Sequence, residues 1–162
     1  MRDQHSIPLL EQLHPKVRKD FRDFIEECEQ VFDITIRIVQ GLRTFEQQDA
    51  LYNIGRTVKG ENATPKHPMG DVVTNSPGGS SYHNFGLAVD IVPITGKKED
   101  WNYNFMKLVN IGSQWNITWG GNFPGSFKDY DHFEAKCGHD WHDLLNMYHN
   151  KQFIRGTNYV NI

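Results

Sequence analysis

Two short segments of the sequence carry side chains of the types that bind metal ions. The segment SSYHNFGLAVD (80–90) places His83 seven residues before Asp90, and the segment KDYDHFEAKCGHDWHD (128–143) adds His132. Imidazole nitrogen and carboxylate oxygen both bind zinc at about 2.0–2.2 Å. Three such ligands leave one coordination position for water, and an open zinc site lowers the pKa of that water towards about 7. His83, Asp90 and His132 are therefore candidate ligands of a catalytic zinc ion.

The residues around His83 and Asp90 predict a turn followed by a strand. Gly86 and the branched residues after it argue against a helix, although seven residues would equal two helical turns. On the predicted strand Asp90 shares a face with Ala88. An acidic residue in an apolar strand is costly to bury unless it is paired, and a metal would supply that pairing. The alternative is a loop histidine and an aspartate held by a neighbouring arginine; these two residues alone do not decide between them.

A hydrolytic zinc site also needs a carboxylate that accepts the proton of the attacking water. Asp129, Asp131 and Glu134 are the candidates near His132. On a regular strand Glu134 shares a face with His132, whereas Asp129 and Asp131 point away. Spacing alone therefore favours Glu134, and Asp129 can serve only if the chain turns or bulges just before His132.

A third element of the predicted site is Arg43, in the segment VQGLRTFEQQDALYNIGRT. It comes after a predicted strand, a glycine and one further residue, and Thr44 with Gln47 then fits a capping box that begins a helix. An arginine at a strand end could stabilise the oxyanion formed when water attacks a carbonyl. The alternative is a surface arginine paired with an acid.

These segments must be positioned by helices and strands that do not alternate regularly. Helical patterns cover residues 15–32, 44–55, 99–115 and 139–149, and strand patterns cover 33–41, 86–94, 117–121 and 131–135. Residues 56–82 are rich in proline and glycine and are predicted to form a long loop that is functional or mobile. Residues 150–162 are predicted to be a docked or frayed tail. We expect one α+β domain spanning residues 1–162, with a mostly antiparallel central sheet flanked by helices.

Composition narrows the function further. The chain has 162 residues, of which 38% are hydrophobic, and a net charge of −3, so neither nucleic acid nor an anionic membrane surface is an expected partner. No apolar run is long enough to span a membrane, and the N-terminus lacks the features of a Sec signal peptide. Cys28 and Cys137 form no CxxC motif, and we expect free thiols. We expect a monomer that is made in the cytoplasm.

Five motifs, in the same order, resemble one group of peptidases. They are QGLRTFEQQDALYNIGRT, VTNSPGG, SYHNFGLAVD, WGGNF and KDYDHFE, and SYHNFGLAVD fits the pattern S-x-H-x-x-G-x-A-x-D. The chain resembles the zinc peptidases of the D-alanyl-D-alanine carboxypeptidase group, which includes the VanX and VanY enzymes. Within it, the chain is most similar to the L-alanyl-D-glutamate peptidases of phage endolysins and bacterial wall hydrolases. The motifs span residues 38 to 135, most of the chain.

The resemblance implies a fold shared with hedgehog signalling domains and zinc on the three candidate ligands. It implies that Asp129 is the catalytic carboxylate, against the spacing argument for Glu134, and we follow the motif position over an idealised strand. It also implies that Arg43 stabilises the transition state and that Ser81 orients the substrate. Manganese and iron are compatible with the same ligand types.

The implied activity is hydrolysis of the L-Ala–D-Glu bond in the stem peptide of peptidoglycan, for cell-wall lysis or remodelling. The protein would reach the wall by phage-mediated release or by another export route. One alternative is a D-Ala–D-Ala carboxypeptidase or dipeptidase. Another is a zinc-containing binding module without turnover, which the presence of both Asp129 and Arg43 disfavours.

The sequence departs from the family pattern at two places. The stretch between Arg56 and Val73 is longer, with KGENATPKHPMG inserted, and we expect residues 57–72 to reshape one wall of the cleft. Asp131 replaces the proline expected before His132. Its negative charge next to the metal is expected to raise the pKa of the bound water or of Asp129.

Overall fold

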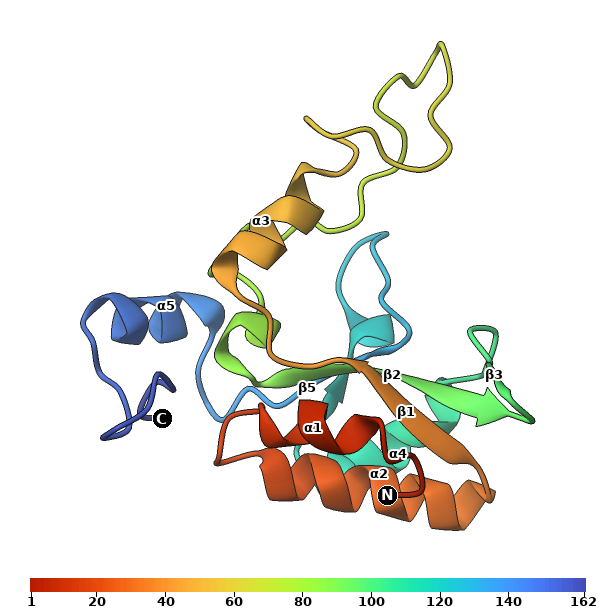
Figure 1. Cartoon of the computed structure of the whole chain (residues 1–162), viewed down its shortest axis with the longest axis vertical. Helices are drawn as coiled ribbons and strands as arrows, with labels where there is room; N and C mark the ends of the chain where they lie inside the picture. Colours follow the sequence, from red (N-terminus) through yellow and green to blue (C-terminus); the bar gives the residue numbers. More distant parts are fainter.

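An antiparallel five-stranded sheet lies at the centre of the structure, a computed structural model that describes residues 1–162 (Figure 1). Its strands are β1 (Thr35–Gln40), β2 (Ala88–Thr95), β3 (Lys98–Glu99), β4 (Thr118–Trp119) and β5 (His132–Glu134). Their order is β1-β2-β5-β4, and β3 pairs with the end of β2. Every pairing is antiparallel, which confirms the predicted α+β class with an antiparallel central sheet.

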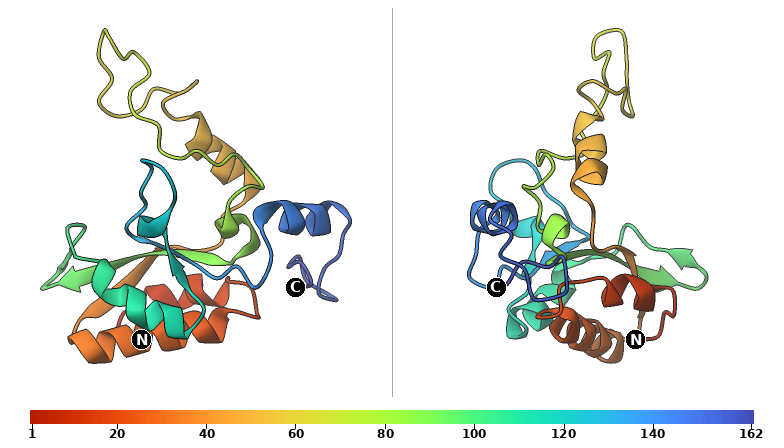
Figure 2. Two further views of the ribbon diagram at one scale, coloured as in Figure 1. Left: turned by 180° about the vertical axis from the view of Figure 1, so that it is seen from behind. Right: turned by 60° about the vertical axis from the view of Figure 1, so that its left-hand side comes forward.

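Helices cover the two faces of the sheet unequally. The α-helices are α1 (Ser6–Glu11), α2 (Arg18–Phe32), α3 (Phe45–Asn53), α4 (Met106–Gln114) and α5 (Trp141–His149), and two short 3-10 helices are η1 (Tyr82–Phe85) and η2 (Gly120–Asn122). Helices α1, α2 and α4 lie against one face, whereas α3, η1 and η2 rise from the other (Figures 1 and 2). None of the helices combines the length and apolar character that crossing a membrane requires.

The core lies between the sheet and the layer of α1, α2 and α4. Helix α2 buries Phe21, Phe24 and Cys28 at the predicted three- and four-residue spacing. Phe24 packs on Phe133 of β5, with ring centroids 5.2 Å apart. Burying a large apolar side chain contributes roughly 1.5–3 kcal/mol. This packing stabilises the sheet on the side of α1, α2 and α4, which is the lower side in Figure 1. The opposite, upper face is therefore left to carry the polar residues.

The capping box predicted at the start of α3 is confirmed. The Thr44 hydroxyl accepts a hydrogen bond from the Gln47 backbone N–H at 3.1 Å, and the Thr44 N–H donates to the Gln47 side chain at 2.8 Å. A cap of this kind contributes about 1 kcal/mol. It also fixes the path of the chain immediately after Arg43.

Several boundaries differ from the prediction, most of all the start of α4. The helix predicted over 99–115 begins only at Met106, because Lys98 and Glu99 pair with β2 and the Asp100 N–H donates to the carbonyl of Pro93. Strand β2 begins at Ala88, two residues later than predicted, and ends at Thr95, one residue later; Pro93 lies within it because a proline removes one donor from a strand without ending it. Helix α1 was not predicted, because it is too short to show a helical period.

The predicted loop 56–82 contains no helix or strand before η1, and it projects away from the sheet beyond α3 (Figure 1). Backbone hydrogen bonds from Gly60 to Met69 and from Asp71 to Glu61, both 2.8 Å, tie its two sides together. Gly70 has φ +72°, and a Cβ there would lie 2.2 Å from a backbone oxygen. Glycine is thus required for this close approach.

The tail 150–162 is docked on the body of the protein. Val160 is buried, and its carbonyl lies 2.8 Å from His14 Nε2 in the segment that follows α1. The ring of Tyr159 packs edge-on against the same histidine. The chain therefore closes its last residues against its first helices.

Candidate metal centre and cleft

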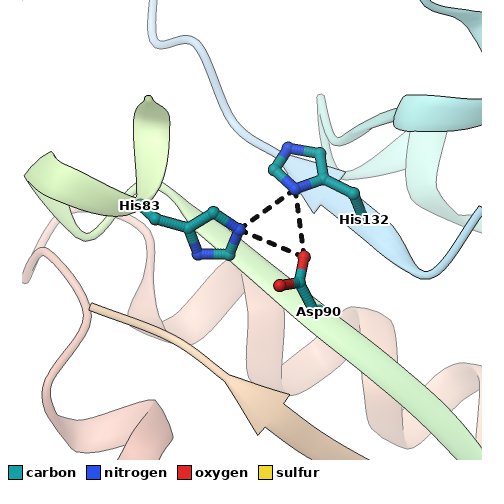
Figure 3. Close-up of side chains that lie close together, drawn as sticks. All are labelled: His83, Asp90 and His132. Carbon is teal, nitrogen blue, oxygen red and sulfur yellow. Dashed lines mark hydrogen bonds and ion pairs between the residues drawn. The ribbon is translucent and has the colours of Figure 1, made fainter. Parts of the chain in front are cut away.

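Three side chains on the upper face of the sheet bring one atom each to a common point (Figure 3). His83 Nε2 lies 3.1 Å from Asp90 Oδ1 and 3.1 Å from His132 Nδ1, and His132 Nδ1 lies 3.1 Å from Asp90 Oδ1. Both histidines are buried, and the aspartate side chain is 16% exposed. The three residues proposed as ligands from the sequence are therefore adjacent, although 49 residues separate the two histidines.

Sheet register places two of these residues together. Asp90 on β2 stands directly opposite His132 on β5 in the antiparallel ladder. Such opposed residues have Cβ atoms about 4.5–5.5 Å apart, so their side chains meet on one face. On the other side of β2, the register with β1 shifts between Ile38 and Gln40, and Gln40 pairs with Asp90.

His83 reaches the same point from η1. Ser81 caps this 3-10 helix, because its hydroxyl accepts the His83 backbone N–H at 3.4 Å. Gly86 ends it with φ +67°, and a Cβ at this position would lie 2.7 Å from the backbone nitrogen of His14. A glycine is therefore needed for the turn that carries the chain from His83 into β2.

In each imidazole, the ring nitrogen that faces away from Asp90 makes a hydrogen bond that sets the tautomer. His83 Nδ1 lies 2.8 Å from the Gly41 carbonyl, which can only accept, so Nδ1 carries the proton and Nε2 keeps its lone pair. His132 Nε2 lies 3.0 Å from Glu134 Oε2 and donates to this carboxylate, which leaves Nδ1 with the lone pair. In neutral imidazoles, both lone pairs then face the carboxylate oxygen of Asp90.

Three electron-pair donors that face one another at 3.1 Å repel unless a positive charge lies between them. Ligand atoms at about 2.0–2.1 Å from a tetrahedral zinc ion are about 3.3 Å apart, close to the observed separation. Imidazole ligands that donate their second N–H to a carbonyl or a carboxylate are typical of protein metal sites. The donor set thus fits a zinc ion.

The charges at the centre favour a cation. Burial alone would raise the pKa of Asp90, but His83 and His132 hold it well below its usual range. Burial alone would lower the pKa of His132, but its hydrogen bonds to Asp90 and Glu134 raise it to about 10. The two carboxylates therefore stabilise positive charge at this point, whether as a proton or as a metal ion.

Arg43 lies beside the centre, between β1 and α3. Its Nη2 is 3.4 Å from Asp90 Oδ2, and its Nη1 donates to Gln48 Oε1 at 2.8 Å. Gln48 is buried and in turn donates to the carbonyl of Ser76 at 2.7 Å, at the base of the long loop. Burial lowers the pKa of Arg43, opposed by Asp90 and Asp129. Its Nε is buried and has no hydrogen-bond partner.

Asp129 comes from the loop that joins η2 to β5, and it lines the same cleft. Burial, together with the negative charges of Asp90 and Asp131, raises its pKa to about 7, against the opposing effect of His132. The chain reaches this position because Gly120 lies against it: a Cβ at Gly120 would be 2.5 Å from the Asp129 carbonyl oxygen. The turn before His132 that Asp129 requires is therefore present, since β5 begins only at that histidine.

Glu134 shares the upper face of β5 with His132, as the spacing argument predicted. Its Oε2 bonds the His132 nitrogen that points away from Asp90, and its side chain is only 5% exposed. Asp131, the third candidate, precedes β5, and its carbonyl accepts a hydrogen bond from Ile91. Of the candidate bases, Glu134 therefore has an evident structural task, which is to hold the imidazole of His132.

These residues line one cleft of about 610 Å³. Its walls include Arg43, His83, Asp90, Asp129 and His132, together with Ser81, Gln48, Glu134, Lys136, Trp141 and the loop residues Val73 to Ser76, Phe123 and Phe127. The base of the long loop thus forms one wall. Sequence reasoning missed Gln48 and Lys136, and the only available signal was their position within the QGLRTFEQQ and KDYDHFEAK segments.

Comparison with known proteins gives a consistent result. A family model described as D-alanyl-D-alanine carboxypeptidase matches residues 74–135, the part that carries the three candidate ligands. The chain is 34% identical over 140 residues to the peptidoglycan L-alanyl-D-glutamate endopeptidase CwlK of Bacillus subtilis, and the match covers 80% of this chain and 77% of that protein.

Solved structures share the fold at lower sequence identity. The L-Ala D-Glu endopeptidase ChiX of Serratia marcescens matches with a TM-score of 0.56 and 18% identity, covering 82% of this chain and 86% of that one. The D,D-pentapeptidase VanY, solved as a variant in complex with Zn(II), matches with a TM-score of 0.57 and 17% identity, covering 76% and 72%.

Proposed function

The chain belongs to the D-alanyl-D-alanine carboxypeptidase family of zinc peptidases, and from that premise we propose that it hydrolyses the L-Ala–D-Glu bond of peptidoglycan stem peptides. The observation that carries this proposal is the meeting of His83, Asp90 and His132 in a cleft that also holds Asp129 and Arg43. The similarity to an L-alanyl-D-glutamate endopeptidase over most of both chains supports this choice of bond.

In the proposed mechanism His83, Asp90 and His132 would hold zinc, while Gly41 and Glu134 orient the two imidazoles. When bound, zinc supplies Lewis-acid chemistry that polarises a carbonyl and makes water more acidic. The protein's own residues then have to orient the peptide, move protons and stabilise the charge that develops.

Asp129 is the proposed general base and acid. Its carboxylate accepts a proton as the water oxygen bonds to the L-Ala carbonyl carbon. It returns a proton to the D-Glu nitrogen as the C–N bond breaks, so that the products are a carboxylic acid and an amine. Burial raises the pKa of Asp129 above the ordinary value, and a raised pKa suits a group that must both accept and return a proton.

Arg43 is the proposed oxyanion stabiliser. Its guanidinium is oriented by Gln48 and Asp90 and lines the cleft, so its positive charge would stabilise the oxygen on which negative charge develops. Ser81, which caps the helix of His83 and lines the cleft, is the proposed contact that orients the substrate backbone. These two residues would act on the peptide, whereas Gln48 would act through Arg43.

A D-Ala–D-Ala carboxypeptidase activity is the second candidate, and the description of the matching family model favours it. The two activities release different products from the same polymer. Purified peptidoglycan would be digested with the zinc-loaded protein, with and without a chelator, and analysed by mass spectrometry. New N-terminal D-Glu would support the proposal, and free D-alanine would support the alternative. If neither product formed, the protein would be a binding module without turnover.

A further inference from the structure

A lysine at the rim of the cleft has no role in the mechanism above. Lys136 follows β5, and its side chain is 55% exposed. Its Nζ lies 3.4 Å from Glu134 Oε1 and 5.8 Å from the centre of the Tyr82 ring, and it makes no other polar contact. The Tyr82 hydroxyl donates to the carbonyl of His139, so the ring beneath the lysine is fixed. Lys136 therefore presents ammonium N–H groups to the cleft.

Arg43 is the only other lysine or arginine that lines the cleft, and the two side chains differ in what they can still bind. The Arg43 side chain is 11% exposed, and both of its terminal nitrogens already contact Gln48 and Asp90. Lys136 pairs with Glu134 Oε1 at 3.4 Å, while Glu134 accepts the N–H of His132 through its other oxygen at 3.0 Å. An ammonium at 3.4 Å makes a long and weak contact, and it has three N–H donors. The exposed Lys136 is thus the better placed of the two to meet an incoming anion.

The proposed substrate brings such an anion into this cleft. In a stem peptide D-Glu is linked onwards through its γ-carboxyl group, so its α-carboxylate stays free beside the scissile bond. A third residue of the diaminopimelate type adds another carboxylate. Three acidic side chains, Asp90, Asp129 and Glu134, line the cleft and would repel these groups. Lys136, at the rim of the same cleft, would offset that repulsion.

We propose that Lys136 is a specificity-determining residue that pairs with a free carboxylate of the stem peptide. This inference rests on the proposed function. A substrate contact made equally in the ground state and the transition state changes KM and leaves kcat nearly unchanged. A half-exposed charge-assisted contact of this kind corresponds to roughly a five- to tenfold effect on kcat/KM.

The test uses three synthetic stem peptides with the zinc-loaded full chain. One has D-Glu and meso-diaminopimelate, the second has D-isoglutamine in place of D-Glu, and the third has L-Lys in place of meso-diaminopimelate. We expect the wild-type protein to cleave the first peptide about five- to tenfold better than one of the other two, mainly through KM. The peptide that loses this advantage identifies the carboxylate that is bound. Lys136→Met should abolish the preference, and Lys136→Arg should keep most of it.

Lys107→Met is the matched control, since Lys107 lies on α4 outside the cleft with its Nζ 5.7 Å from the Tyr103 ring centre. It should leave the preference unchanged, and zinc content should be equal in all variants. If the wild-type protein cleaved all three peptides equally, or if Lys136→Met kept the wild-type preference, the role of Lys136 would be refuted. If the wild-type protein cleaved none of them, the proposed function itself would fail, and the inference with it.

Discussion

Two parts of the site, a strand half and a loop half, are built in different ways. The strand half consists of Asp90, His132 and Glu134, which stand on the paired strands β2 and β5. The loop half consists of Asp129 and Phe123, from the loop between η2 and β5. In the strand half, positions follow from hydrogen-bond register above a packed core. In the loop half, they depend on close contacts such as that between Gly120 and Asp129.

This difference in construction suggests that the two halves have different functions. A metal centre tolerates little error in ligand position, and register over a rigid core supplies that precision. A group that transfers protons must approach substrate and water, and loops on a rigid scaffold commonly carry such groups. We therefore expect substitutions in the strand half to act on metal binding and substitutions in the loop half to act on turnover.

The largest effect is expected from His132→Ala. Removing this ligand leaves Asp90 and His83 with too few donors for a stable zinc site, so both metal binding and hydrolysis should be lost. The loss of zinc affinity should exceed the roughly 10- to 100-fold cost typical of losing a residue that only orients a ligand. Zinc content by elemental analysis and digestion of peptidoglycan check this, with the exposed His149→Ala as control. Retention of stoichiometric zinc would show that the ligands have been misidentified.

Asp129→Asn should separate the two halves. The amide cannot accept the proton of water, so kcat should fall by about 10²- to 10⁴-fold while zinc binding stays near the wild-type level. Stopped assays on a synthetic stem peptide and zinc titration against a chromophoric chelator measure the two quantities. Full activity in this variant would move the role of base to another carboxylate, with Glu134 or Asp131 as the candidates.

Glu134→Ala should show the opposite pattern to Asp129→Asn. Without the carboxylate the His132 imidazole loses its orienting partner, and zinc affinity should fall by roughly 10- to 100-fold. Glu134→Gln keeps an oxygen that can accept the N–H, so its loss should be smaller. Chelator competition measures the affinity, and kcat at saturating zinc serves as the second readout. A large fall in kcat with unchanged affinity would contradict the assignment of Glu134 to the strand half.

Gly120→Ala tests the loop half through the backbone. The added methyl would lie 2.5 Å from the Asp129 carbonyl oxygen and 3.0 Å from His132 Cβ, so the loop must shift. Overpacking of this kind costs about 1–3 kcal/mol, and we expect a lower kcat with a smaller change in zinc affinity. Gly125→Ala in the same loop is the control, since it has φ +77° but nothing within 4 Å of the new methyl. Equal effects of the two substitutions would indicate general loop strain.

The smallest effect concerns His14, a buried histidine without carboxylate partners. Burial lowers its pKa below the ordinary value of 6.5, in contrast to His132. The unfolded chain therefore binds the proton more readily, so the contribution of His14 to stability is complete above pH 6.5 and is lost as the pH falls through the folded-state pKa. Urea unfolding at several pH values should show a weaker loss on acidification in His14→Gln than in wild type. Identical pH dependence would exclude this linkage.

Much of this protein follows from local sequence. The capping box at Thr44 and Gln47, the buried stripe of α2 and the strand before Gly41 are encoded within a few residues, and each could be predicted from them. The three ligand types and their motif order also indicated the metal centre. Helix α1 and the pair formed by Lys98 and Glu99 were missed, because their segments are too short to show a period.

Only the tertiary structure decided what each carboxylate can do. Spacing placed Glu134 on the face of His132, which is correct, but it could not show that Glu134 meets the outer nitrogen of this imidazole. Nor could it show that the chain turns at Gly120 to bring Asp129 into the cleft. The sequence by itself determined the residue types and the local elements, since these depend on neighbours along the chain. Register and side-chain direction depend on contacts between distant segments, and these arise only when the sheet has formed.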